Sequence, residues 1–319
     1  MGMKQSWTLT KFRIMLAMRN RAFLFFGVII PVALLFLFAA IFGRGGGRAV
    51  SYVLASILAM TVMGSFWGLS QQLVIFREQG ILRRFRLAPA GAGAMLASSI
   101  FSNLVLTLPA VAIEMALARW VLHMPSWGNL AGVFVMVTLG GATFATLGLV
   151  VASVANSMME TQVINQLLWL AFMLLSGVTV PLPTLPAWLQ TVALYLPATY
   201  LVTGLQRALL DSAGPSQLGA EILSLGGSTL IAFFISRQIF RWEPEEKLPS
   251  SAKTWTLAAL IPFLLLGMWE TRDGQRRAQA RSIFRSTYEP PQRNQHNQPT
   301  PDAPAAPAPP APGSGVRPE

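Results

Sequence analysis

Long apolar runs recur along most of the chain, and they restrict its fold more than any other feature of the sequence. A helix needs about 20 consecutive apolar residues to cross the hydrocarbon core of a bilayer. Unpaired backbone polar groups are too costly in lipid, so such runs must be helical. We therefore predict an all-α polytopic membrane protein with six transmembrane helices, at residues 22–43, 50–75, 95–118, 130–154, 163–183 and 217–237.

The composition excludes a single soluble domain. Hydrophobic residues make up 53% of the 319 residues and charged residues only 12%, whereas soluble domains carry about 25% charged residues. The chain has no cysteine and only two histidines, His123 and His296, so no thiolate or histidine metal cluster is predicted. The net charge of +11 gathers at the ends of apolar runs and in the tail, which is typical of topology signals and lipid contacts rather than of nucleic-acid binding.

The distribution of lysine and arginine predicts which side of the membrane the N-terminus occupies. If residues 1–21 lie in the cytoplasm, the inner segments before residue 254 carry thirteen of these residues and the outer segments four. Cytoplasmic loops collect them, so both ends of the six-span domain, residues 22–241, are expected inside. Residues 1–21 are predicted to form an amphipathic connecting helix in the inner interface, with simple solvated basic residues as the alternative.

A seventh apolar run at 254–269 is shorter than the others and contains Pro262. Its length fits a tilted span, an interfacial segment or a helix lying against the bundle. If it crosses, the basic stretch after it lies outside, against the charge rule, so we favour a run that does not cross. Residues 242–271 are assigned to a linker with a possible seventh membrane segment, and residues 272–319 to a basic stretch followed by a Pro/Ala-rich disordered tail.

Prolines interrupt the apolar stretch between the fifth and sixth spans. Pro181, Pro183 and Pro186 stop one helix, a new helix can start at Pro186, and Pro197 breaks it again. Irregular chain exposed to lipid is too costly at membrane depth. We therefore predict short re-entrant helices that dip into the outer leaflet and lean on the bundle.

A short cationic stretch, VIFREQGILRRFRLAP at 74–89, follows the second span. It is predicted to form a helix on the inner surface that ends at Pro89, with an ordinary basic loop as the alternative. A topology signal alone would need only the arginines. It would not need Gly80, where a close backbone approach is easiest, or Glu78, whose charge weakens the positive balance.

The motif F-R-E-x-G-x-L-R-R-x-x-x-x-P within that stretch resembles the signature loop of the ABC type-2 exporter permeases. Residues 174–206 resemble the same family's passage from span five through its outer re-entrant helices, and residues 19–36 are similar to its connecting helix and first span. The resemblance implies that the cationic stretch is a coupling helix that docks into a separate ATPase subunit. The implied coupling residues are Glu78, Gly80, Leu82, Arg83, Arg84 and Pro89.

The same resemblance implies a permease rather than an enzyme, located in the cytoplasmic (inner) membrane of a bacterium. No G-x-x-x-x-G-K-[ST] loop occurs in the chain, so ATP and Mg²⁺ are expected on the partner ATPase and no cofactor on this chain. Two ATPase copies and a homodimer of this chain are implied, although a heterodimer is not distinguished. Membrane lipids are the other expected partners, and nucleic acid is not one.

In that family spans two and five line the central path, so residues on them are candidates for a substrate wall, with ordinary helix packing as the alternative. These candidates are Phe66, Trp67, Gln166, Trp169, Met173 and Ser176. Glu114, Pro181 and Pro186 are candidates for an outer gate; alternatively, Glu114 is an interfacial acid loosely paired with Arg119. No catalytic group and no metal site are predicted.

These features favour ATP-driven export of a hydrophobic or amphipathic substrate, such as a drug, a lipid or a lipid-linked glycan. One alternative is a non-transporting membrane anchor or assembly factor that works through its tail. A second alternative is an intramembrane enzyme. That chemistry needs paired acids, a metal cluster or an activated nucleophile, whereas the six predicted spans contain no histidine and only two acids, Glu114 and Glu221, which are far apart in the sequence.

Overall fold

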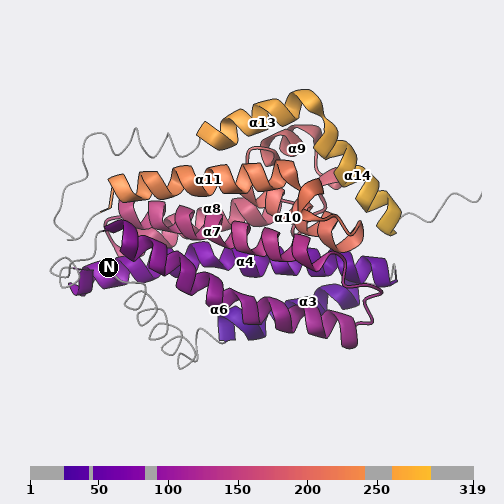
Figure 1. The fold of residues 1–319 in the computed structure, drawn as a ribbon, viewed down its shortest axis with the longest axis horizontal. Helices are drawn as coiled ribbons and strands as arrows, with labels where there is room; N and C mark the ends of the chain where they lie inside the picture. The colour runs from indigo at the N-terminus through magenta and orange to yellow at the C-terminus, as the bar shows by residue number, and fades with distance from the viewer. Residues whose placement is uncertain (1–24, 43–45, 83–91, 241–260, 289–319) are drawn as a thin grey trace, which may run out of the picture. The chain divides into compact units, whose positions relative to one another are not determined.

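The computed structural model describes residues 25–42, 46–82, 92–240 and 261–288, and within these ranges the chain is helical and contains no strand (Figure 1). Five of the described helices are long and apolar enough to cross a membrane. They are α4 (Gly47–Glu78), α6 (Ala92–Trp120), α7 (Leu130–Val154), α8 (Met158–Leu175) and α11 (Gly219–Gln238). The first predicted span is described over residues 25–42, as the π-helix η1 (Phe25–Ile29) and α3 (Ile30–Phe42).

The predicted spans agree with the observed helices except for the fifth, whose predicted start at 163 is five residues after the start of α8 at Met158. The bounds of α4, α6, α7 and α11 lie within three residues of the predicted ones. The fifth predicted span, 163–183, is wrong at its C-terminal end, because α8 stops at Leu175. Gly177 has a φ of 90°, which a right-handed helix cannot accommodate, and a short 3₁₀ helix, η3 (Leu182–Thr184), follows. Apolar length alone could not show this break.

Helix α4 is the centre of the bundle. It packs against α3, α6, α7, α8 and the short helix α10 (Pro197–Leu210), and Figure 1 shows it running the length of the bundle between α7 and α6. The approach of α7 is closest at Gly148, where an added Cβ would lie 2.4 Å from the Phe66 carbonyl oxygen. Small residues at such positions let membrane helices pack backbone against backbone. Nearby, Phe172 lies edge-to-face against both Phe66 and Phe144, with ring centroids 5.9 and 5.4 Å apart.

The chain between α8 and α11 forms short helices, as its prolines predicted. After η3 come α9 (Ala187–Ala193), α10 and a 3₁₀ turn, η4 (Pro215–Gln217). The break between α9 and α10 is held by two side chains of α10: the Thr199 hydroxyl donates to the Ala193 carbonyl (2.6 Å) and the Tyr200 hydroxyl to the Leu194 carbonyl (3.0 Å). The Ala193 carbonyl also accepts a 3.0 Å bond from the Leu196 N–H, so the side chains of α10 add to the backbone bonds that pair the last carbonyls after α9. The re-entrant placement of these helices in a membrane stays a prediction.

Two further helices follow residue 260. The described part of the seventh apolar run belongs to α13 (Ile261–Asp273), which lies beside α11 and α9. The basic stretch predicted as the start of a tail forms a second helix, α14 (Gln275–Tyr288), whose residues Arg276, Ala280 and Ile283 are buried. The amino-acid composition did not predict that α14 is helical, because contacts with the bundle order this segment. The residues predicted to be disordered, 289–319, lie outside the described ranges.

Candidate functional site

The C-terminal end of α4 is tied to the connection between α7 and α8. Glu78 Oε1 accepts a 2.8 Å hydrogen bond from the backbone N–H of Met158, the first residue of α8. The buried guanidinium of Arg77 donates to the backbone carbonyls of Ala152 (2.9 Å) and Ala155 at the end of α7. A helix N-terminus carries partial positive charge, so the Glu78 carboxylate is also favoured there electrostatically. Two adjacent side chains thus join three helices at one point.

The turn after α4 holds the remaining coupling residues that the structure describes. Gly80 has a φ of 68°, a conformation that other L-residues rarely adopt. A Cβ added there would meet nothing within 4 Å among the described residues, so this glycine is required by its backbone conformation, and a close approach to another backbone stays a prediction. Leu82 is fully buried in an apolar cluster at this end of the bundle. The other three predicted residues lie outside the described ranges: Arg83, Arg84 and Pro89.

A line of polar side chains, which we call the polar seam, connects α4 to α6 and α8. It consists of three hydrogen-bonded pairs: Thr61 with Glu114 (2.6 Å), Ser65 with Asn103 (2.6 Å) and Ser70 with Asn165 (2.7 Å). Such bonds between membrane helices contribute about 0.6–2 kcal/mol each. The polar seam was not predicted from the sequence. Its only signal was the recurrence of hydroxyl residues within the apolar run 50–75.

Glu114 does not lie in a wet interface. Glu114 is fully buried in α6. Its Oε1 accepts the hydrogen bond from Thr61, and its Oε2 has no hydrogen-bond partner among the described residues. Arg119 instead donates to the backbone carbonyl of Met124. The alternative of a loose Glu114–Arg119 pair is therefore wrong, because the helix faces separate the two side chains and each finds a closer partner. A buried carboxyl group with one unbonded oxygen is costly unless it is protonated or meets a further donor.

The six residues predicted to line a substrate path do not form one wall. Phe66 and Ser176 are buried, at 1% exposure each, whereas Gln166 is exposed on the surface of α8. Between these extremes, the partly buried Trp67 and Trp169 meet edge-to-face, with centroids 6.0 Å apart, and Met173 packs against the core. Trp67, Trp169 and Met173 are thus partly exposed and Gln166 exposed in a single copy of the chain, whereas Phe66 and Ser176 are not.

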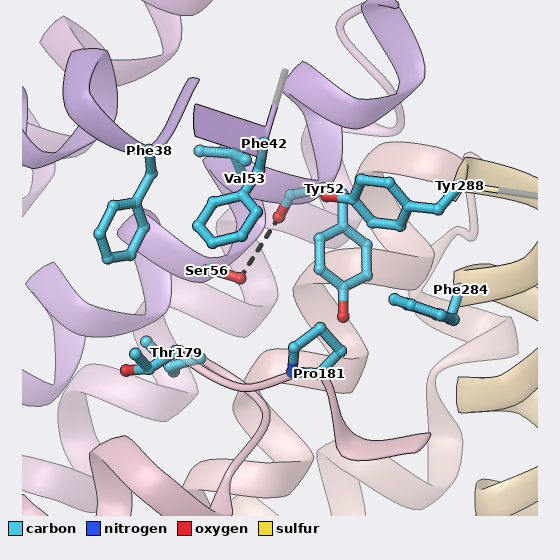
Figure 2. Close-up of a pocket in the computed structure, with 10 residues that line it drawn as sticks. Phe38, Phe42, Tyr52, Val53, Ser56, Thr179, Pro181, Phe284 and Tyr288 are labelled. Atoms are coloured by element: carbon cyan, nitrogen blue, oxygen red, sulfur yellow. Dashed lines mark hydrogen bonds between the residues drawn. The ribbon is translucent and has the colours of Figure 1, made fainter. Parts of the chain in front are cut away.

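An apolar pocket of about 300 Å³ lies at the other end of α4. Figure 2 shows its aromatic walls: Phe38 and Phe42 from α3, Tyr52 from α4, and Phe284 and Tyr288 from α14. The Tyr52 and Tyr288 rings meet edge-to-face at 5.6 Å, closing one side. The remaining lining residues are Val53, Ser56, Val178, Thr179 and Pro181.

The three predicted gate residues are therefore not brought together. Pro181 lines the apolar pocket, Pro186 precedes the first turn of α9, and Glu114 belongs to the polar seam. Among the residues that the structure describes, no group of three or more His, Asp or Glu side chains is placed to hold a metal ion. At one end of α4, Arg77 and Glu78 join α4 to α7 and α8 by hydrogen bonds, and we call this contact the joint. At the other end of α4 lies a pocket of a size that suits a small ligand.

The apolar helices, the polar seam between them and the joint at the end of α4 define an integral membrane protein of the helical-bundle class. Residues 4–210 match the family described as ABC-2 type transporter, which covers the joint, the seam and both short helices α9 and α10. The chain belongs to this family of membrane proteins. The resemblance seen in the sequence is confirmed.

Three curated relatives fit this assignment. The chain is 25% identical over 179 residues to the linearmycin resistance permease protein LnrN of Bacillus subtilis, covering 56% of this chain and 45% of the relative. It is 24% identical over 140 residues to the probable multidrug ABC transporter permease YbhR of Escherichia coli, covering 44% and 38%. It is also 24% identical over 171 residues to the E. coli inner membrane transport permease YhhJ, covering 53% and 44%. The chain thus spans less than half the length of these relatives.

Proposed function

We propose that this chain is the permease subunit of an ATP-driven exporter that moves a hydrophobic or amphipathic compound, such as a drug, a lipid or a lipid-linked glycan, out of the cytoplasm. ATP and Mg²⁺ bind to a separate ATPase, and two ATPases serve a homodimer of this chain. The bundle lies in a bacterial cytoplasmic membrane with the N-terminus inside, six spans within residues 22–241, and α9 and α10 in the outer leaflet. The relatives' names, which include drug resistance and an inner membrane, support this proposal.

The observation that carries the proposal is the joint made by Arg77 and Glu78. Both side chains are bonded to the α7–α8 connection, so a displacement applied at the adjoining turn moves three helices together. Helix α4 continues from this joint through the centre of the bundle to the apolar pocket. A coupling element in the cationic stretch therefore acts directly on α4, which is fixed to α7 and α8, rather than on a free loop.

Through this movement of α4, the nucleotide state of the ATPase decides from which side of the membrane the substrate site is accessible. A ligand shifts a conformational equilibrium only through contacts that differ between the two states. The ATPase supplies these contacts at Glu78, Gly80, Arg83, Arg84 and Pro89 when it closes on ATP, while the buried Leu82 anchors the adjoining turn in the apolar cluster. Movement of α4 then changes its packing against α6 and α8, whose bonds to it form the polar seam.

The path for the substrate runs along the accessible face shared by α4 and α8. Gln166 exposes a side-chain amide on a helix of otherwise apolar surface, where Leu167, Leu170 and Leu174 are also exposed. An amide facing lipid is costly. We infer that this face meets an aqueous path or the second copy of the chain, with the Trp67–Trp169 pair offering a flat apolar surface to the substrate.

The test is reconstitution of the full chain with a candidate ABC ATPase in vesicles. We expect the two polypeptides to purify together, and a fluorescent hydrophobic drug to accumulate in inside-out vesicles only when ATP is present and vanadate is absent. Equal accumulation without the ATPase would overturn the proposal. Stable binding of an ATPase without any ATP-dependent movement of drugs or fluorescent lipids would instead indicate a non-transporting anchor.

A further inference from the structure

The described contacts distinguish the two ends of the bundle. One end carries the joint at Glu78, and Arg237 near the end of α11 lies there too, since its side chain is 3.6 Å from the Cβ position of Gly93 at the start of α6. The opposite end carries Arg48 at the start of α4, which bonds to Asp211 (3.1 Å) after α10. With 32 residues, α4 separates these ends by about 48 Å at 1.5 Å per residue.

The C-terminal helices dock at the Arg48 end. Arg48 donates a 3.2 Å hydrogen bond to the Ser286 hydroxyl of α14. Arg276, in the first turn of α14, bonds to Glu221 (3.1 Å) in the first turn of α11 and to Thr203 (2.8 Å) of α10. Arg237 therefore lies at one end of the bundle, and Arg276, later in the chain, lies at the other.

A buried network of charged side chains holds α14 against the bundle. Arg276 is 2% exposed and makes two bonds to Glu270 (2.9 and 3.0 Å), while its guanidinium lies 4.4 Å from the centre of the Tyr200 ring. Glu221, fully buried, is shared with Arg207 at 2.9 Å. Two arginines and two glutamates thus balance within one cluster. Buried ions persist only when they are paired and hydrogen-bonded, as all four are here.

The outward surfaces of the two helices differ in polarity. Among the side chains of α13 that the structure describes, the exposed ones are apolar, namely Leu264, Leu265, Met268 and Trp269, each 50–63% exposed. Those of α14 include Arg281, Ser282, Arg285 and Ser286. An apolar outer surface suits lipid and a polar one suits water or headgroups. The change falls at Gly274, where the backbone turns with a φ of 66°.

We infer that the chain crosses the membrane a further time between Arg237 and Arg276, so that α14 lies on the opposite side from the Glu78 joint. There α14 contributes Phe284 and Tyr288 to the apolar pocket. With the N-terminus inside and the six proposed spans before it, this crossing is the seventh, and the basic residues of α14 lie outside. The positive-inside rule opposes this only weakly, because early helices dominate topology and Arg276 is neutralised by its partners.

Thiol labelling of the full chain tests the inference without assuming an orientation. The chain has no cysteine, so single cysteines report cleanly. Ser282→Cys probes α14, Ser126→Cys the loop between α6 and α7, and Gln79→Cys the joint; all three positions are exposed. With a membrane-impermeant maleimide on intact cells, we expect Ser282→Cys to be labelled or protected together with Ser126→Cys and opposite to Gln79→Cys. Labelling together with Gln79→Cys would overturn the inference.

A reporter fusion gives a second reading that needs no reactive thiol. Alkaline phosphatase fused after residue 319 is active only outside the cytoplasm, and a green fluorescent protein fused there shines only inside it. If Ser126→Cys is labelled from outside, we expect an active phosphatase and a dark fluorescent fusion. A bright fluorescent fusion with inactive phosphatase would place α14 on the Glu78 side and refute the crossing. Neither readout depends on transport, so the result is separate from the proposed function.

Discussion

Glu78 and Met158 are 80 residues apart in the sequence, yet the carboxylate of the first accepts a 2.8 Å hydrogen bond from the backbone N–H of the second. This bond makes the first turn of α8 part of the same unit as the end of α4. The sequence resemblance assigned Glu78 to the contact with an ATPase. The structure shows that its side chain also has an internal partner, so a substitution there has two separable effects.

Replacing Glu78 tests this double role. Glu78→Ala removes the acceptor for the Met158 N–H, and we expect the free energy of unfolding to fall by about 0.5–1.5 kcal/mol, the usual net value of one hydrogen bond. Glu78→Gln keeps an oxygen acceptor and is expected to lose less. Thermal unfolding in detergent measures the first effect, and drug accumulation in vesicles with the ATPase measures the second. Under the proposed function, Glu78→Ala reduces transport while ATPase binding persists.

The control for these variants is Gln79→Ala, an exposed neighbour. Its stability is expected to stay within about 0.5 kcal/mol of the original protein. If Glu78→Ala behaves like Gln79→Ala in both stability and transport, the joint has no mechanical role.

Gly148 is expected to tolerate no side chain. Gly148→Ala places a Cβ 2.4 Å from the Phe66 carbonyl oxygen, so α4 and α7 must move apart. Overpacking of this kind costs about 1–3 kcal/mol. Gly226→Ala in α11 is the matched control, since a Cβ there meets nothing within 4 Å, and alanine is a better helix former than glycine. Melting temperatures that fall equally for both variants would contradict the close approach of α4 and α7.

The polar seam predicts a non-additive pair at Thr61 and Glu114. Thr61→Val leaves the buried Glu114 carboxyl without its only described hydrogen-bond donor, and we expect a loss of about 1–3 kcal/mol. Combining it with Glu114→Leu removes both polar partners, which can be nearly neutral. The double variant should therefore be more stable than Thr61→Val alone, as measured by thermal unfolding. Additive losses would show that the two side chains act independently.

The charge network around Arg276 predicts a similar pattern with a larger amplitude. Arg276→Met leaves Glu270 buried without its arginine, and breaking a buried pair in this way costs about 3–5 kcal/mol. The double variant Arg276→Met with Glu270→Met keeps the Arg207–Glu221 pair intact and should recover much of the loss. The exposed Arg281→Met serves as the control for charge alone, with a change within about 0.5 kcal/mol expected. Equal melting temperatures for the single and double variants would contradict the network.

Local and periodic features were readable in the sequence. Apolar runs located α4, α6, α7 and α11 to within three residues, because a membrane helix needs a minimum apolar length whatever its neighbours are. Prolines marked the short helices after α8, because the proline ring itself forbids helix continuation. The cationic motif identified the family, which the match over residues 4–210 confirms.

Features that depend on a partner from elsewhere in the chain were not readable. The end of α8 at Leu175, the burial of Glu114 against Thr61 and the order of α14 all went unpredicted or were predicted wrongly. Each depends on a specific neighbour that sequence periodicity does not reveal. The scattered path and gate residues show the same limit, because helical spacing defines a face but not what that face meets.

By itself the sequence determined that this chain is a helical membrane protein of the ABC-2 transporter family, since hydrophobic length and a family motif both lie in consecutive residues. Only the tertiary structure decided that Glu78 is hydrogen-bonded to α8 and that Arg276 forms ion pairs with both Glu270 and Glu221. It also decided that Phe284 and Phe38 line the same pocket. The reason is that hydrogen bonds and ion pairs act over a few ångströms. Which residues come that close is set by how the helices pack, not by where they stand in the chain.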